Sequence, residues 1–181
     1  MTKQIIKCGM EQLDALDTLY DRVTEYLENT INYPIWTRGE YPCRESIKNA
    51  VLRGEQYICI DEDGAAVGAF VLNEDPAGDY GSGGWSVQLE EGEYLIIHTL
   101  AVLPESAGRG IGGYMVRYCI DKARNEGYKA VRLDVVPGNI PARRLYEKEG
   151  FMFAGKKDLR RGIAAIPEFE LYELNFDNAG E

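Results

Sequence analysis

The sequence predicts an α/β (α+β) fold in one domain, with a mixed, mostly antiparallel sheet of six to seven strands and about four flanking helices. The chain has 181 residues, a length typical of one domain, and 45% of them are hydrophobic, as in globular proteins. Short apolar runs alternate with stretches whose apolar residues recur at helical spacing. A strand–helix–strand pattern across residues 94–136 implies one parallel pair joined by a right-handed crossover.

The N-terminal half is expected to begin with a short strand at residues 3–7. Apolar residues at helical spacing predict a first helix over residues 10–28; they are Leu13, Leu16, Leu19, Tyr20, Val23 and Leu27. A second helix is expected at residues 43–52, closed by Gly54. The turn Glu62-Asp63-Gly64 between apolar runs at 56–61 and 65–73 predicts a β-hairpin.

The C-terminal half starts with a glycine-rich, acidic segment at residues 74–93, expected to be a loop around a short strand near Trp85. Residues 94–102 and 130–136 read as strands, and a helix over 110–126 with one apolar stripe, ended by Gly127, lies between them. Asn139 and Pro141 predict the N-cap and first turn of a short helix ending at Lys148. Final strands are expected at residues 151–157 and 169–176. The domain is placed at residues 3–176, with a tail at 177–181.

The formal net charge of −10 at pH 7 argues against binding to nucleic acid, for which a basic face is expected. The charge is compatible with a cationic ligand, but charge alone favours plain solubility. No run of 18 apolar residues is present, and Met1 is not followed by the apolar core of a signal peptide, so we expect a soluble, cytoplasmic protein without membrane contact. Four widely spaced cysteines and one histidine predict free thiols and no metal site.

The segment from residue 101 to residue 113 carries the strongest functional signal. An apolar strand ends at Pro104, and a loop with Gly108, Gly110, Gly112 and Gly113 opens an amphipathic helix. Glycines allow close backbone approach, and the first turn of a helix offers N–H donors and partial positive charge. This combination predicts a cradle for an anion, namely a phosphate.

A dinucleotide-binding fingerprint is an alternative interpretation of this loop. Gly108, Gly110 and Gly113 fit G-x-G-x-x-G, and Asp134 follows about twenty residues later at the end of a strand. Residues 103–106 separate strand and loop too widely for the Rossmann turn, and no second nucleotide-binding half follows. The helix after Asp134 is also too short for a Rossmann crossover, so this interpretation is disfavoured.

Three motifs in register resemble the GNAT superfamily of acetyl-CoA-dependent N-acetyltransferases. His98-Thr-Leu-Ala-Val102 resembles its fourth strand, and Ala107-Gly-Arg-Gly-Ile-Gly112 resembles its pyrophosphate loop, Q/R-x-x-G-x-G/A. The segment from Asn139 to Phe151 matches N-x-x-A-x-x-L-Y-x-x-x-G-F. Ala107 stands at the Q/R position, so that side-chain contact is missing, although the backbone donors do not need it and Arg109 offers charge nearby.

The resemblance implies acetyl-CoA as cosubstrate and a splay between the strands at 94–102 and 130–136. The pantetheine arm would lie in that gap, and the pyrophosphate would bind the glycine turn. The residues implied to bind the cofactor are Leu100, Ala101, Val102, Gly108, Arg109, Gly110, Ile111, Gly112, Gly113, Asn139, Ala142 and Tyr146. Asn139 as a pure N-cap is an alternative, and Arg143 and Arg144 are either phosphate contacts or solvated charges.

The implied reaction is direct acyl transfer from a thioester to an amine, catalysed by an acyltransferase. Tyr146 matches the tyrosine that is placed to protonate the leaving sulfur, and a core tyrosine is the alternative. His98 is a candidate base, because an unperturbed imidazole has a pKa of about 6.5 and His98 is expected to share a strand face with Tyr94, Ile96 and Leu100. Glu91 or Glu93 acting through water is the rival.

The loop after the first helix is implied to line the acceptor side. Its aromatic residues, Tyr33, Trp36 and Tyr41, lie near charged Arg38 and Glu40, and aromatics beside acids suit an ammonium group. Anchoring of the loop is an alternative role for each aromatic residue. We expect a small-molecule amine as acceptor, with a peptide or protein amine or a non-catalytic acyl-CoA-binding module as alternatives. The resemblance also implies a homodimer.

Overall fold

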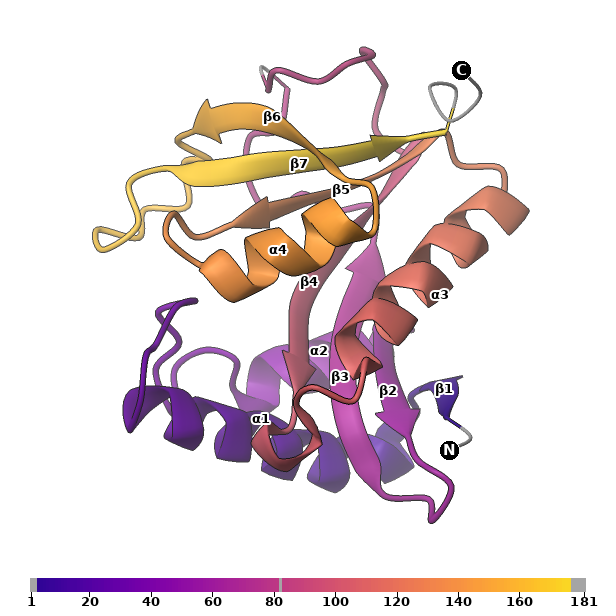
Figure 1. Cartoon of the computed structure of the whole chain (residues 1–181), viewed down its shortest axis with the longest axis vertical. Helices are drawn as coiled ribbons and strands as arrows, with labels where there is room; N and C mark the ends of the chain where they lie inside the picture. The colour runs from indigo at the N-terminus through magenta and orange to yellow at the C-terminus, as the bar shows by residue number, and fades with distance from the viewer. Residues whose placement is uncertain (1–2, 82, 177–181) are drawn as a thin grey trace. The chain divides into compact units, whose positions relative to one another are not determined.

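The computed structural model of the chain describes residues 3–81 and 83–176, which form seven strands and four α-helices (Figure 1). The elements up to the middle of the chain are β1 (Gln4–Lys7), the 3-10 turn η1 (Met10–Gln12), α1 (Leu13–Glu28), α2 (Arg44–Leu52), β2 (Gln56–Ile60) and β3 (Ala66–Asn73). They are followed by β4 (Tyr94–Val102), the 3-10 turn η2 (Pro104–Ser106), α3 (Ile111–Asn125), β5 (Ala130–Val135), α4 (Ile140–Lys148), β6 (Met152–Lys157) and β7 (Phe169–Asn175).

The strands follow the order β1-β2-β3-β4-β5-β7-β6 and form a mixed sheet. The β1–β2, β2–β3, β5–β7 and β6–β7 pairs are antiparallel, and β4–β5 is parallel. The parallel ladder covers Tyr94–Ile96 and Ala130–Arg132, whereas β5 goes on pairing with β7 as far as Val135. Because β4 also continues, to Val102, the two strands part beyond this short ladder. The predicted mixed sheet and its splay are confirmed.

The chain divides into two compact units, each with its own core. The first holds the described residues up to Leu72 together with His98–Met115. Its core forms where the apolar stripe of α1, including Leu16 and Leu19, packs with Ile47 of α2 and with residues of the strands, Ala101 among them. The periodicity of α1 therefore predicted the buried face of this helix correctly.

The second unit holds Asn73–Ile97 and the described residues from Val116 onward. Its core includes a buried ion pair between Arg132 of β5 and Glu173 of β7, with Nε and Oε2 2.8 Å apart. The Arg132 guanidinium lies 4.2 Å from the ring centroids of both Trp85 and Tyr94, which adds cation–π contacts. A buried charge is tolerated when it is paired in this way.

The predicted elements agree with the structure to within a residue or two, apart from two places. Residues 10–12 form a 3-10 turn instead of the start of the first helix. The short strand expected near Trp85 does not form in the described part of the segment (74–81 and 83–93). One long-range and one local hydrogen bond hold this segment instead: Gly84 N–H donates to Ala154 O at 2.8 Å, and the Trp85 indole donates to Tyr80 O, five residues earlier, at 2.7 Å.

All four cysteines are free thiols, as predicted; Cys43 is half-buried and the other three are buried. Within the described residues, none of the helices has the length and apolarity needed to cross a membrane. The expected tail at 177–181 lies outside the described residues, and the domain boundaries at 3 and 176 stay predictions.

Candidate functional site

The glycine turn before α3 has the geometry that an anion cradle requires. Gly108 and Gly110 adopt φ of 75° and 72°, a left-handed conformation that favours glycine. A Cβ added to either glycine would meet no protein atom within 4 Å, so the space beside both is open. Tyr114 N–H donates to Gly110 O at 3.1 Å, which makes Gly110 the N-cap of α3. The N–H groups of residues 111–113 thus precede the first helical hydrogen bond and form the donor end of the helix.

Lys3, just before β1, contacts this turn although the two lie far apart in the sequence. Its ammonium group donates to Arg109 O at 2.9 Å, and its own carbonyl accepts from the Tyr114 hydroxyl at 2.9 Å. Lys3 Nζ also lies 5.8 Å from the centre of the Tyr114 ring. Lys3 therefore contacts both the glycine turn, at Arg109, and the first turn of α3, at Tyr114. Sequence reasoning missed this role of Lys3, because no local pattern reports a contact over 106 residues.

Strand β4 carries a backbone irregularity at Thr99, the residue after His98. Thr99 has φ of 47°, a left-handed conformation that costs a β-branched residue about 1–3 kcal/mol. A residue in this conformation interrupts the alternation of side chains along a strand. The expected common face of Tyr94, Ile96, His98 and Leu100 therefore does not continue past Thr99. Beyond it, Ala101 is buried in the core of the first unit, and Leu100 and Val102 are half-buried.

Helix α4 and its N-cap contain the predicted site residues of the second unit, Asn139, Ala142 and Tyr146. Asn139 is its N-cap, as predicted: Asn139 Oδ1 accepts a hydrogen bond from Ala142 N–H at 3.2 Å. Tyr146 is 7% exposed, and its ring packs edge-on against Phe151 with centroids 5.6 Å apart. Burial raises the pKa of Tyr146, with Cys119 and Asp134 adding to the effect. The phenol therefore stays protonated, as a proton donor must.

The rival base Glu93 is already engaged at the protein surface. Its carboxylate pairs with Lys129 and also accepts the Glu90 N–H. These contacts lower the pKa of Glu93, which makes it a weaker base. Glu91 is exposed, and His98 is half-buried on β4.

The aromatic residues of the loop between α1 and α2 differ in their surroundings. Trp36 packs on the core of the first unit, edge-on against Tyr20 with ring centroids 6.1 Å apart. The Asn32 side chain accepts from Trp36 N–H at 3.0 Å and donates to Trp36 O at 2.6 Å. Trp36 thus anchors the loop. Tyr33 is half-buried, and Tyr41 is 50% exposed.

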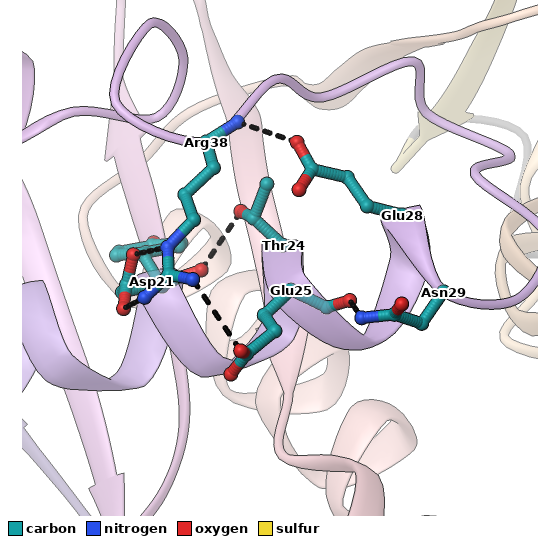
Figure 2. A network of polar contacts seen from close by, with 7 residues as sticks. Asp21, Thr24, Glu25, Glu28, Asn29 and Arg38 are labelled. Carbon is teal, nitrogen blue, oxygen red and sulfur yellow. Dashed lines mark hydrogen bonds and ion pairs between the residues drawn. The ribbon is translucent and has the colours of Figure 1, made fainter.

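Arg38 ties the same loop to the acidic side of α1. Figure 2 shows Arg38 reaching Asp21 and Glu25: Nε and Nη2 each lie 2.6 Å from an Asp21 oxygen, and Nη1 lies 3.3 Å from Glu25. Its backbone N–H donates to Glu28 at 2.9 Å. A pocket of about 350 Å³ opens beside this network. The aspartates that line it, Asp17 and Asp21, are already paired with Arg44 and Arg38, so they do not offer unpaired charge to an amine.

Asp134, the acid required by the dinucleotide interpretation, is also engaged. Arg161 forms a bidentate pair with it at 2.8 and 2.7 Å, and the Tyr80 hydroxyl donates to it at 2.6 Å. A carboxylate with these partners is poorly suited to bind a ribose, which weakens that interpretation further.

The predicted site residues fall in both units. The first unit contains His98, Leu100, Ala101, Val102, the turn residues Gly108, Arg109, Gly110, Ile111, Gly112 and Gly113, and the loop residues Tyr33, Trp36 and Tyr41. The second unit contains Asn139, Ala142 and Tyr146. Within the first unit, the end of β4 leads through η2 directly into the glycine turn.

Comparison with known proteins adds a family match and a fold match. Residues 16–151 match the model of the acetyltransferase (GNAT) family. A streptothricin acetyltransferase of Streptomyces lavendulae is 37% identical over 79 residues, which are 43% of this chain and 42% of that protein's length. A GNAT-family acetyltransferase of Streptococcus agalactiae has a TM-score of 0.77 at 18% identity, covering 96% of this chain and 95% of its own. An aminoglycoside acetyltransferase solved with coenzyme A has a TM-score of 0.71 at 18% identity, covering 97% and 96%.

Proposed function

Because the chain belongs to the acetyltransferase (GNAT) family, we propose that it transfers the acetyl group of acetyl-CoA directly to a primary amine of a small molecule. The observation that carries the proposal is the glycine turn, with its left-handed Gly108 and Gly110 and the open space beside them. The acyltransferase class and acetyl-CoA as cosubstrate follow from the family. The acceptor and the roles of individual residues are our proposal.

The pyrophosphate of acetyl-CoA is assigned to the backbone N–H groups at the start of α3. Each hydrogen bond to a charged group contributes roughly 1.5–3 kcal/mol net. The helix dipole adds roughly 0.3–1 kcal/mol for an anion at this end. The remaining backbone contacts, to the pantetheine arm, are assigned to Leu100, Ala101 and Val102, where β4 has left its ladder with β5.

Two proton transfers then limit the reaction. An amine with a pKa of about 10.4 is neutral in only about one molecule in 2,500 at pH 7, so a base assists the attack. The sulfur leaves as a thiolate unless an acid protonates it. We assign the acid to Tyr146, which burial keeps protonated, and the base to His98.

The assignment of the base predicts different outcomes for two variants. His98→Gln should lower kcat/KM for the amine by roughly a hundredfold or more, because the general base is lost. Glu93→Gln should change kcat/KM little, since the Glu93 carboxylate is paired with Lys129. Steady-state kinetics with an accepted amine tests both variants. The opposite ranking would move the base to Glu93, acting through water.

We also assign Asn139 two roles, N-cap of α4 and amide donor to the pantetheine arm. Substitutions should then affect capping and cofactor binding separately. Asn139→Ala removes the N-cap and should cost about 1 kcal/mol of unfolding free energy. Asn139→Asp keeps a good cap but loses the amide donor assigned to the pantetheine, so stability should be retained while coenzyme A binds about tenfold more weakly. Urea denaturation and isothermal titration measure the two quantities. Unchanged affinity in Asn139→Asp would restrict this residue to capping.

The small-molecule acceptor is supported by the names of similar proteins, which acetylate streptothricin or aminoglycosides. Thiol release from acetyl-CoA, measured over a panel of small amines and of peptides with free amino groups, tests the proposal. Release with small amines supports it, and release with peptides alone would shift the acceptor class. Binding of acetyl-CoA without release over the whole panel would favour a non-catalytic module. The homodimer and the cytoplasmic location remain predictions.

A further inference from the structure

The left-handed conformation of Thr99 must be stabilised by contacts with neighbouring groups. A β-branched residue rarely adopts φ of 47°, and strained residues persist where the surrounding structure over-determines them. Thr99 follows His98 and precedes Leu100–Val102, the stretch assigned to the pantetheine arm. Its backbone therefore sets the course of the part of β4 that the cofactor would use.

Tyr20 of α1 contacts Thr99 through its hydroxyl group. Its hydroxyl donates to the Thr99 carbonyl at 3.0 Å and lies 3.4 Å from Thr99 Oγ1, across 79 residues of sequence. The Tyr20 side chain is 1% exposed, and burial raises the pKa of its phenol, so the group remains a neutral donor. Trp36 packs edge-on against the same ring. Tyr20 is thus fixed between the core, the α1–α2 loop and β4.

Gln56 of β2 fixes the direction of the Tyr20 proton. Its amide nitrogen donates to Phe70 O at 2.9 Å and Tyr57 O at 3.2 Å, which orients the amide, and lies 3.4 Å from the Tyr20 hydroxyl. An NH₂ group can only donate, so the Tyr20 hydroxyl proton points away from it, toward Thr99. Gln56 Oε1 is buried and has no hydrogen-bond partner within residues 3–81 and 83–176.

We propose that Tyr20 is a positioning residue, which holds Thr99 in its left-handed conformation through the hydrogen bond to its carbonyl and so sets the backbone of Leu100–Val102 for acetyl-CoA. The inference rests on the proposed function in one respect, namely that acetyl-CoA binds along Leu100–Val102. Tyr20 does not touch the reacting atoms in this role. It acts through Thr99.

The first test compares two variants of α1. Tyr20→Phe keeps the ring and removes the hydroxyl, so the Kd for coenzyme A, measured by isothermal titration, should rise about tenfold. Thr24→Val is the matched control. It also removes a buried hydroxyl from α1, but that hydroxyl donates to Tyr20 O within the helix, at 2.8 Å. The Kd of this variant should match that of the parent protein even if its stability falls.

The second test is a rescue. Glycine adopts positive φ without strain, so Thr99→Gly should no longer need the Tyr20 hydroxyl. In the double variant Tyr20→Phe/Thr99→Gly, the Kd for coenzyme A should return to within about twofold of that of Thr99→Gly alone. A loss caused by general destabilisation would not be rescued by adding a glycine to a strand.

The outcomes separate this inference from the proposed function. If the parent protein does not bind coenzyme A, the proposed function fails. If the parent protein binds and Tyr20→Phe binds equally well, the inference is overturned while the function stands. A loss in Tyr20→Phe without rescue by Thr99→Gly also overturns it, because the hydroxyl would then matter for some reason other than the Thr99 backbone.

Discussion

Replacing Gly110 by Asp should weaken acetyl-CoA binding by roughly a hundredfold. Asp tolerates the left-handed conformation of this position better than most residues, and its Cβ would meet no protein atom within 4 Å, so the fold should survive. The carboxylate would occupy the open space assigned to the pyrophosphate. Like charges about 4 Å apart repel by several kcal/mol at the dielectric of a protein surface, which corresponds to a hundredfold or more in affinity. Isothermal titration with acetyl-CoA measures the effect.

Two further variants separate charge, shape and strain at this position. Gly110→Asn has the shape of Gly110→Asp without its charge and should weaken binding only about tenfold. Gly64→Asp places the same residue at a hairpin glycine with φ of 78° and open space, so it controls for strain and should bind acetyl-CoA normally. Equal affinity of Gly110→Asp and the parent protein would remove the pyrophosphate from this turn.

Tyr146→Phe should slow turnover by roughly 10²–10⁴-fold while the affinity for coenzyme A is retained. The phenyl ring preserves the packing on Phe151, and only the proposed proton donor to the leaving sulfur is lost. Because burial raises the pKa of Tyr146 above its ordinary value near 10, the phenol remains protonated as pH rises from 7 to 10. The parent enzyme should therefore lose no turnover over this range through ionisation of Tyr146. Thiol release at saturating amine measures turnover.

Tyr172 provides the matched control for this substitution. It is also a buried tyrosine of the second unit, 1% exposed, and it packs edge-on against Phe153 with ring centroids 5.7 Å apart. Tyr172→Phe should leave turnover unchanged. If Tyr146→Phe and Tyr172→Phe behave alike, Tyr146 is a core residue and has no part in the chemistry.

Elements with strong local signals could be predicted from the sequence. The apolar stripe that includes Leu16 and Leu19 predicted α1. Asn139 and Pro141 predicted the N-terminus of α4, because helix starts depend on residues close together in the sequence. Local patterns thus placed most helix and strand boundaries within one or two residues. The family was also predicted correctly, since three motifs in register are specific even where each alone is weak.

The two differences between the predicted and the observed fold come from contacts that hydrophobic periodicity does not report. The segment around Trp85 was expected to contain a strand, but its conformation is set by Ala154 and Arg132, which lie far along the chain. The 3-10 turn at residues 10–12 depends on the Gln12 side chain, which accepts the Gly9 N–H at 2.7 Å. A tertiary contact decides the first of these segments and a local side-chain hydrogen bond the second, and hydrophobic periodicity reports neither.

The candidate site likewise contains some residues that could be predicted from the sequence and others that could not. The glycine turn was visible in the sequence because glycine itself marks positive φ and close backbone approach. The residues that hold the site were not visible: Lys3 contacts residues more than 100 positions away, and Tyr20 reaches Thr99 across 79. The left-handed conformation of Thr99 also has no local signal, because threonine does not favour it. Sequence therefore indicated the groups proposed to touch the cofactor and missed those that position them.

A crystal structure with bound acetyl-CoA tests the central claim most directly. We expect pyrophosphate oxygens at about 3 Å from backbone nitrogens of residues 108–113, and the thioester sulfur within hydrogen-bonding reach of the Tyr146 hydroxyl. A pyrophosphate bound elsewhere, or a thioester out of reach of Tyr146, would contradict the account.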